Sequence, residues 1–184
     1  MRIVLPVTNL AKAGEREAVF KNLKGEDRVT IKYDMLHVVP PMSAPDFIKS
    51  SPLADPTGFV QVDKHTLQHG KYENVFALGD CAALPISKTA AAISKQAPVL
   101  VHNLVAQMEG KPLAAKYDGY TSCPIVVGRN RLILAEFLYD NIPKETFGMV
   151  FDQAKPSFFM SLLKKHVFPR SYWHGMLKGH WYGP

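Results

Sequence analysis

Residues 72–97 read YENVFALGDCAALPISKTAAAISKQA, and the rest of the chain is organised around this stretch. Residues 74–78 form a short apolar run of strand length, which Gly79 ends. Asp80 follows at the carboxyl end of the predicted strand, where open α/β sheets bind ligands. The sequence therefore predicts a buried strand, a sharp turn and a carboxylate held at the strand end.

A small-residue helix is predicted to follow this turn. Ser87 is a suitable N-cap, so the helix should begin at Lys88 and Thr89. The alanines at 90–92 keep the first turn slim, and its N–H groups favour an electron-rich ligand edge. These features indicate a ligand site. The alternative is a plain strand–turn–helix unit in which Asp80 only caps a loop.

Composition places the chain among globular proteins. Its 184 residues are 47% apolar and 21% charged, and no apolar run reaches the length of a membrane-spanning helix. Pro6 breaks the short apolar patch at the start, which resembles neither a secretory signal nor a transit peptide. Two cysteines do not make a disulfide framework, so a reduced or internal compartment is expected.

The net charge of +6 is concentrated near the end of the chain. Asp152 is the last acidic residue, and five lysines or arginines and three histidines follow it. No nucleic-acid-binding module accompanies this charge, so we expect no nucleic-acid partner. The histidines are scattered and neither HExxH nor CxxC occurs, so we expect no metal site.

Periodicity and turn residues predict the remaining elements. His37 lies in an apolar run and is interpreted as a core residue rather than a catalyst. The predicted elements are a helix or strand-flanking segment at 15–23, a strand at 29–33, an apolar run at 35–39, a crossing linker at Pro40-Pro41, a short helix at 46–50, an edge strand at 58–63, a turn at 64–68, a break in the long helix at Pro98, a helix end at Gly110, and a hairpin of 125–127 and 132–137 that turns at 128–131.

The C-terminal tail, residues 157–182, is predicted to be amphipathic. Ser157 can cap a helix with Phe and Leu on one side and lysines on another, and Pro169 should interrupt it. A second segment repeats Tyr, Trp, Met and Leu at helical spacing. Such helices are typical of those that lie in a bilayer interface, although the tail could instead pack on its own domain.

Four motifs, in this order, resemble one family. They are YDMLHVVPPM, VDKHTLQH, GDC…LPISKTAAA and KYDGYTSCPIVVGRNRLILAEF. The chain from about Arg16 onward is similar to the mitochondrial-type sulfide:quinone oxidoreductases, which are flavoproteins with two dinucleotide-binding domains. The resemblance implies an α/β fold: the end of the middle nucleotide-binding-like domain at 1–39, a returning segment of the FAD-binding domain at 40–110, and a redox-cysteine and membrane- or quinone-interface domain at 111–184.

The resemblance also implies roles for residues around the central stretch. Asp80 would bind the ribityl chain of FAD, with backbone contacts from Leu78 and Gly79. Lys88 would stabilise the reduced, anionic flavin, and Thr89 would contribute an N–H or hydroxyl. From the sequence alone, Lys88 could equally be a solvated lysine at a helix start, which the helix dipole disfavours slightly.

Cys123 is the candidate catalytic residue. It follows a polar turn and precedes an apolar run, and on this pattern alone it could be a buried structural cysteine. In the resembled family this cysteine is one of a redox pair beside the flavin. Sulfide attacks the pair's disulfide, one cysteine becomes a persulfide, and the other passes two electrons to FAD. Cys81 is not expected to be the partner, which the family supplies from an upstream segment.

The implied function is FAD-dependent oxidation of sulfide by ubiquinone, with the persulfide sulfur passed to a small acceptor, at the mitochondrial inner membrane as a peripheral protein. The glycines form no GxGxxG phosphate fingerprint, so we expect a C-terminal portion that binds FAD poorly and is inactive alone. Two alternatives stay open: a related type II NADH:quinone reductase, which would not need Cys123, and a non-catalytic membrane-surface fragment.

Overall fold

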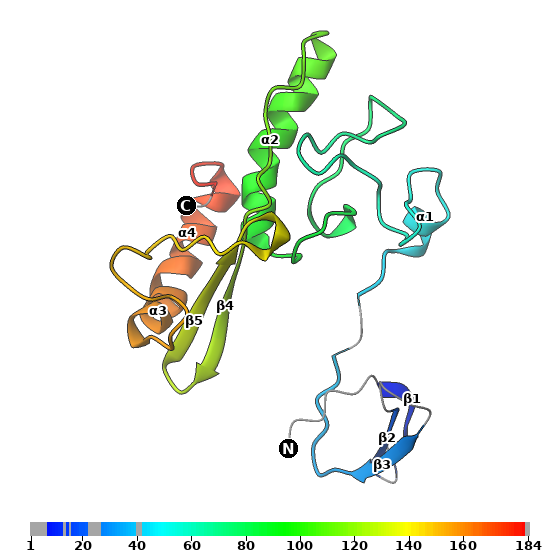
Figure 1. Cartoon of the computed structure of the whole chain (residues 1–184), viewed down its shortest axis with the longest axis vertical. Helices are drawn as coiled ribbons and strands as arrows, with labels where there is room; N and C mark the ends of the chain where they lie inside the picture. The colour runs from blue at the N-terminus through cyan, green and yellow to red at the C-terminus, as the bar shows by residue number, and fades with distance from the viewer. Residues whose placement is uncertain (1–6, 13, 15, 22–26, 40–41, 183–184) are drawn as a thin grey trace. The chain divides into compact units, whose positions relative to one another are not determined.

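The computed structural model describes residues 7–12, 14, 16–21, 27–39 and 42–182. By its internal contacts the chain divides into two compact units, Met1–Met42 and Ser43–Pro184, and each is described by itself (Figure 1). Among the described residues, no helix is long and apolar enough to cross a bilayer.

The first unit is a small antiparallel sheet. Its strands β1 (Val7–Lys12), β2 (Glu17–Lys21) and β3 (Arg28–Lys32) lie in the order β1-β2-β3. Ala18 of β2 pairs with Ile31 and is fully buried. The strand predicted at 29–33 is therefore confirmed within one residue, and the ambiguous segment at 15–23 contains a strand.

The apolar run at 35–39 does not form a regular element. Met35 is 86% exposed and Val39 is 77% exposed, and His37 is exposed as well. The interpretation of His37 as a core residue is wrong, because His37 is exposed. The linker predicted at Pro40-Pro41 lies outside the described residues.

The second unit begins with irregular chain around one short helix, α1 (Asp46–Lys49), which matches the prediction at 46–50. The strand predicted at 74–78 and the edge strand predicted at 58–63 are wrong. Phe76 makes a single bridge to Gln68, and Val60 makes single bridges to Ala54 and Ala82. A strand needs a ladder of hydrogen bonds to a neighbour, and none of the described residues extends these single bridges.

The long helix α2 (Ala90–Met108) begins two residues later than predicted. Its N-cap is Thr89, whose hydroxyl accepts a hydrogen bond from the N–H of Ala92, so the prediction of Ser87 as the cap is wrong. Pro98 does not break the helix, since it removes only one helical donor while the buried face continues past it. Gly110 ends the helix with a φ of 67°, as predicted.

The chain then runs back along α2 (Figure 1). Asn103, which is fully buried, holds it there: its amide donates to the carbonyls of Thr66 and Ala115 and accepts from the N–H of Ala115. This returning segment leads into the antiparallel hairpin of β4 (Thr121–Gly128) and β5 (Arg131–Phe137). The predicted hairpin is confirmed, and β4 starts earlier than predicted. Asn130 adopts a φ of 55° in its turn.

The C-terminal helices are α3 (Phe158–Leu162), the π-helical turn η3 (Leu163–Val167), α4 (Phe168–His174) and the short η4 (Met176–Lys178). Ser157 caps α3 as predicted, accepting from the N–H of Met160. Pro169 does not interrupt the helix. The wider π turn just before it gives room for the proline ring, which would clash with a carbonyl in a regular helix.

Two apolar clusters stabilise the second unit. The larger contains Leu67, Ala82 and three tyrosines, Tyr117, Tyr120 and Tyr139. The smaller is formed by Leu132 and Leu134 of β5 with Met160 of α3. The observed fold is a mixed α/β arrangement of hairpins and helices, in agreement with the predicted class.

Candidate active site

The start of α2 is tied to the start of β4 by two threonines. The hydroxyl of Thr89 lies 3.0 Å from that of Thr121, and the Thr121 hydroxyl donates to the carbonyl of Ser87. Because the single hydroxyl proton of Thr121 is donated to Ser87, the donor between the two threonines is Thr89. This chain of hydrogen bonds fixes the first turn of the helix against the strand that carries Cys123.

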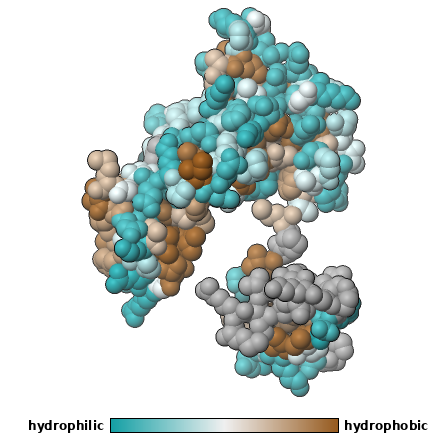
Figure 2. Space-filling model, viewed as in Figure 1, coloured by the Kyte–Doolittle hydropathy of each residue, from teal (hydrophilic) through white to brown (hydrophobic). Residues whose placement is uncertain are grey.

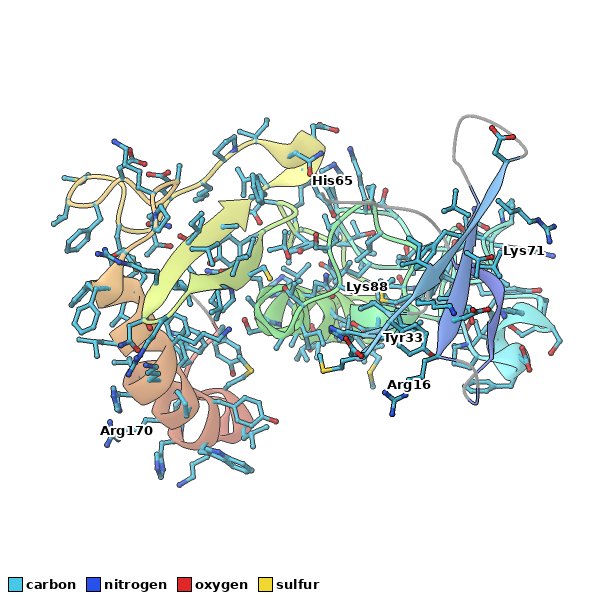
Figure 3. The ribbon with its side chains drawn as sticks, turned by 90° about the horizontal axis from the view of Figure 1, so that it is seen from below. Arg16, Tyr33, His65, Lys71, Lys88 and Arg170 are labelled. Atoms are coloured by element: carbon cyan, nitrogen blue, oxygen red, sulfur yellow. The ribbon has the colours of Figure 1, made fainter. Side chains whose placement is uncertain are left out.

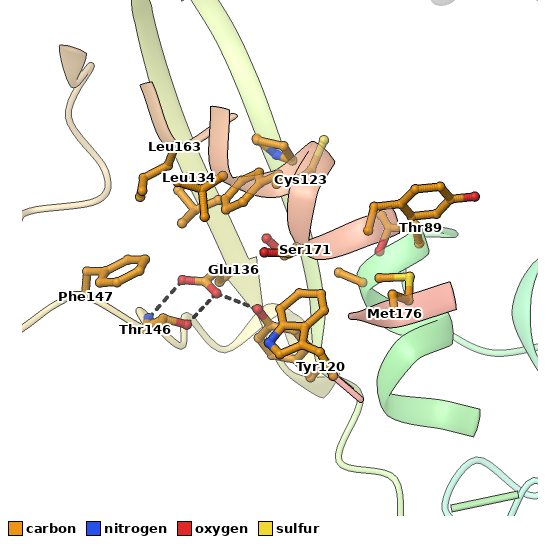
Figure 4. A pocket seen from close by; sticks show the side chains of 18 residues that line it. Thr89, Tyr120, Cys123, Leu134, Glu136, Thr146, Phe147, Leu163, Ser171 and Met176 are labelled. Atoms are coloured by element: carbon orange, nitrogen blue, oxygen red, sulfur yellow. Dashed lines mark hydrogen bonds between the residues drawn. The ribbon is translucent and has the colours of Figure 1, made fainter. Parts of the chain in front are cut away.

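A cavity of about 570 Å³ opens beside this junction (Figure 4). Its walls come from the start of α2, from β4 and β5, from the loop after β5 and from the C-terminal helices. The lining residues are Thr89, Ala90, Ala91, Tyr120, Ser122, Cys123, Pro124, Leu134, Glu136, Thr146, Phe147, Leu163, Val167, Phe168, Ser171, Tyr172, Met176 and Trp181. The walls are largely apolar, so the cavity suits a flat or hydrophobic ligand with few polar atoms.

Cys123 lies on β4 opposite Ala135, is exposed, and lines this cavity as a free thiol. The ammonium of Lys164 donates a 2.8 Å hydrogen bond to the carbonyl of Pro124, the next residue. Cys123 is therefore open to small reactants, and a lysine is held at the neighbouring carbonyl.

Cys81 also has a lysine at the carbonyl of the next residue, where Lys88 bonds to Ala82, but it differs from Cys123 in exposure and position. It is partly buried, does not line the cavity, and donates its thiol to the carbonyl of Leu78. Both cysteines are free. A packing role therefore suits Cys81.

The other predicted flavin contacts lie in the loop before α2, around the short helix η1 (Gly79–Cys81). Gly79 has a φ of 70°, and its N–H donates to the buried Gln96 side chain over 2.7 Å. Asp80 is exposed, and it forms no ion pair with any described residue. Thr89 lines the cavity with Cys123, whereas Leu78, Gly79, Asp80 and Lys88 do not.

Lys88 points into this loop (Figure 3). Its ammonium donates to the carbonyl of Ala82 over 2.9 Å and lies 4.2 Å from the centre of the Phe59 ring. Partial burial lowers the pKa of Lys88, and the nearby Asp80 carboxylate offsets part of that effect. Lys88 and Asp80 therefore interact electrostatically. Lys88 directly precedes Thr89, which lines the cavity together with Cys123.

The sequence reasoning missed a buried carboxylate. Glu136 on β5 is 3% exposed and lines the cavity (Figure 4). It accepts hydrogen bonds from the Tyr120 hydroxyl, the Thr146 hydroxyl and N–H, and the Gln153 amide. One signal could have found it: Glu136 continues the alternation of Leu132 and Leu134, so it occupies an inward position of the strand.

Apolar side chains are exposed along the tail and the hairpin, and Figure 2 shows them gathered over the hairpin and α3. The exposed residues include Val126, Val127, Phe158, Phe159, Trp173 and Leu177. Arg170 projects from α4 (Figure 3), and Trp173, His174 and Lys178 lie around it in an open hollow. Among the described residues, no group of three or more His, Cys, Asp or Glu could hold a metal ion.

Sequence comparison finds that the chain is similar to a portion of known enzymes. It is 58% identical over 173 residues to the mitochondrial sulfide:quinone oxidoreductase of Dictyostelium discoideum, covering 94% of this chain and 37% of that protein. The mitochondrial sulfide:quinone oxidoreductase of Mus musculus is 54% identical over 172 residues, covering 92% and 38%. This chain is homologous to a portion of the mitochondrial sulfide:quinone oxidoreductases. It spans less than two fifths of the length of these relatives.

Two further similarities are more limited. Ferroptosis suppressor protein 1 of Taeniopygia guttata is 38% identical over 73 residues, 40% of this chain and 19% of that protein. A chain in the cryo-EM structure of the Tetrahymena thermophila mitochondrial ATP synthase matches with a TM-score of 0.77 at 26% identity, over 92% of this chain and 40% of that one. No protein-family model matches. The functional proposal is based on the sulfide:quinone oxidoreductases, because their high identity extends over almost all of this chain.

Proposed function

We propose that this chain carries the redox cysteine, part of the flavin site and the quinone-facing surface of a sulfide:quinone oxidoreductase. The observation that carries the proposal is the placement of Cys123, an accessible thiol, on the wall of an apolar cavity at the start of α2. Homology to a portion of sulfide:quinone oxidoreductases supplies the reaction.

Cys123 is the proposed catalytic residue. In the first step, hydrosulfide attacks a disulfide between Cys123 and a second cysteine that lies outside this chain. One cysteine leaves as a thiolate and the other becomes a persulfide, so no atom or electron is lost. The ammonium of Lys164 bonds to the carbonyl of the next residue, Pro124, and so places a positive charge near this step.

The residues near the start of α2 suit the ribityl and ring portions of FAD. Ala90 and Ala91 line the cavity in the first turn, where helical N–H groups lack intrahelical acceptors. The exposed Asp80 carboxylate could accept ribityl hydroxyls, with Leu78 and Gly79 beside it, while Thr89 and Lys88 would face the ring. When bound, FAD would accept two electrons from the thiolate. The pyrophosphate would be held by a fingerprint that this chain lacks.

The cavity and the tail suit the acceptor, a ubiquinone. A ring of that size fits an apolar cavity of about 570 Å³, and Phe147, Phe168 and Trp181 offer aromatic surfaces to it. The tail, residues 157–182, would place this cavity at the surface of the mitochondrial inner membrane, because exposed Trp and Phe side chains alternate there with lysines. A small thiol or similar acceptor would remove the persulfide sulfur.

One experiment tests the proposed role of Cys123 without requiring bound flavin. The chain is converted to a mixed disulfide with a small thiol, treated with sulfide, trapped with an alkylating reagent and analysed by peptide mass spectrometry. We expect the persulfide on the Cys123 peptide, with Cys81→Ser behaving like the original chain and Cys123→Ser giving none. Persulfide formation at Cys81 alone would contradict the proposal.

A second experiment distinguishes a sulfide:quinone oxidoreductase from a type II NADH:quinone reductase. In the flavin-loaded protein, Cys123→Ser should abolish sulfide-dependent reduction of quinone. A type II NADH:quinone reductase would instead keep NADH oxidation in the same variant, because that reaction needs no cysteine at this position.

A further inference from the structure

Glu136 is held by donors of two different kinds on its two oxygens. Oε2 accepts from the N–H of Thr146 over 2.8 Å and from the amide of Gln153 over 2.6 Å. The Gln153 amide is itself fixed, because its oxygen accepts from the N–H of Phe147 and its nitrogen also donates to the carbonyl of Leu134. Neither donor at Oε2 can become an acceptor.

The Oε1 atom of Glu136 has reversible partners. It accepts from the hydroxyl of Tyr120 over 2.5 Å and from the hydroxyl of Thr146 over 2.6 Å. A hydroxyl can donate or accept, so both groups can turn and take a hydrogen bond from a protonated carboxyl. A proton added to Glu136 therefore belongs on Oε1, between these two hydroxyls.

These two hydroxyls connect different surroundings. Thr146 lies in an exposed segment of the loop after β5, and Tyr120 is 3% exposed (Figure 4). Both side chains line the cavity together with Glu136. Glu136 is the only residue with a formal charge at neutral pH among the described residues that line it. The row of Thr146, Glu136 and Tyr120 therefore leads from solvent to the interior of an otherwise uncharged cavity.

We propose that Thr146, Glu136 and Tyr120 form a proton relay that delivers solvent protons to a quinone in this cavity. The inference rests on the proposed function, because it takes the ligand to be a quinone. A solvent proton first reaches Oε1 of Glu136 through Thr146. Tyr120 then donates its hydroxyl proton to a quinone oxygen and takes the proton from Oε1, which returns Glu136 to its carboxylate form.

The balance of the reaction is simple. Reduction of one quinone to a quinol consumes two electrons and two protons, so the relay operates twice in each reduction. The electrons come from a two-electron donor, such as reduced flavin. The relay itself gains and loses only protons, and each group returns to its starting state.

Several neighbouring groups set the field in which the relay works. Lys95 of α2 lies 5.7 Å from the centre of the Tyr120 ring, while burial and the neighbouring Glu136 raise the pKa of Tyr120. The other titratable or charged neighbours are Cys123 of β4, Tyr172 of α4, Asp118 before β4, and Lys144 and Glu145 in the loop.

The geometry also indicates a variant that should preserve the structure. In Glu136→Gln, the amide oxygen can keep the two fixed donors of the Oε2 position, while the amide nitrogen can donate to the hydroxyls of Tyr120 and Thr146. All hydrogen bonds are then retained, but the side chain can no longer carry a transferable proton. Tyr120→Phe removes the last step instead and leaves Glu136 in place.

The experiment uses the full chain without flavin. Decylubiquinone is bound to excess protein, dithionite supplies the electrons, and quinol formation is followed by stopped-flow absorbance in H₂O and in D₂O. Quenching of Trp181 fluorescence in a Trp173→Phe background reports binding. The matched control is Tyr139→Phe, a buried tyrosine that does not line the cavity and whose hydroxyl donates to the carbonyl of Lys64.

We expect Tyr120→Phe and Glu136→Gln to slow quinol formation by about tenfold or more, since positioned proton transfer contributes at least that much to rates. The solvent isotope effect and pH dependence should change in both variants, and Tyr139→Phe should behave like the original chain. Tyr120→Phe decides the question if Glu136→Gln does not fold.

Two results would overturn the relay, and they differ in what they imply for the proposed function. Bound quinone that is reduced at the original rate, with the original isotope effect, in Tyr120→Phe would refute the relay and leave the proposed function intact. A chain that binds no quinone would refute the relay together with the quinone-binding part of the proposed function.

Discussion

The Thr89 hydroxyl lies 3.0 Å from the Thr121 hydroxyl and donates to it. This bond joins the predicted flavin-facing end of α2 to the strand that carries Cys123, two residues further on. It fixes how far Cys123 lies from the helix start, and the proposed function requires this distance to stay constant.

The threonine pair should be energetically coupled. Thr89→Val and Thr121→Val each leave a partner without its hydrogen bond, so a double-mutant cycle in urea should give a coupling free energy of about 0.5–1.5 kcal/mol. Thr57→Val is the control, because Thr57 is exposed and its hydroxyl bonds to Asp55. Strictly additive effects at Thr89 and Thr121 would show that the bond does not form in solution.

Gly119 should tolerate no side chain. Its φ is 88°, and an added Cβ would lie 2.4 Å from Cγ of Tyr139 and 2.5 Å from its backbone nitrogen. Gly119→Ala should lower the free energy of unfolding by several times the roughly 1 kcal/mol that a positive φ alone costs. Gly110→Ala is matched to it, because Gly110 also has a positive φ but nothing within 4 Å. Urea unfolding compares the two, and equal losses would count against the described packing.

The chain should lose stability at alkaline pH. Burial raises the pKa of Tyr117 from 10.0 to about 12, and burial raises the pKa values of Tyr120 and Tyr139 as well. The folded state then keeps protons that unfolded tyrosines release, so the stabilisation is complete below pH 10.0 and is lost as pH rises through about 12. Urea midpoints across this window should fall, and less steeply in Tyr117→Phe.

Lys88 should act in the opposite direction, over a lower pH range. Its pKa is lowered by burial, so the unfolded state binds the proton more strongly and the penalty fades as pH rises towards 10.5. Lys88→Met should therefore raise the free energy of unfolding at neutral pH more than near pH 10.5. A pH-independent effect would indicate that Lys88 is fully solvated.

The tail should bind anionic membranes. Trp173 and Leu177 are 62% and 55% exposed, and Lys178 and Arg170 lie beside Trp173. Replacing both apolar residues by serine should reduce co-sedimentation with phosphatidylserine-containing vesicles, and high salt should weaken binding of the original chain. The exposed pair Met35 and Val39, similarly replaced, serves as the control. Equal losses in both double variants would indicate nonspecific apolar adsorption.

The sequence predicted best where local pattern decides structure. Alternating apolar residues and the turn at Asn130 gave the hairpin, and Ser157 gave the start of α3, because each signal acts within a few residues. The strand at 74–78 failed, since a strand depends on partners that sequence does not name. Ser87 and Thr89 are both good caps, and the contact with Thr121 distinguishes them only in three dimensions.

The candidate site was predictable in part for the same reason. The resemblance directed attention to Cys123 and Thr89, and both line the cavity. Glu136 was missed because its role depends on hydrogen bonds from Tyr120, Thr146 and Gln153, which lie up to 17 residues away in the sequence. The roles of Leu78, Gly79, Asp80 and Lys88 towards FAD, and the three-part division at residues 39 and 110, stay predictions.

Residues of both apolar clusters of the second unit line the cavity. Tyr120 belongs to the larger cluster and Leu134 to the smaller one, while Phe147 and Phe168 pack on the smaller from the side. A ligand filling the space between them would complete a shared interior. We expect the two clusters to unfold independently when no ligand is bound. With a ligand bound, hydrogen exchange should show them unfolding as a single cooperative unit, so that ligand binding also raises the stability of the second unit.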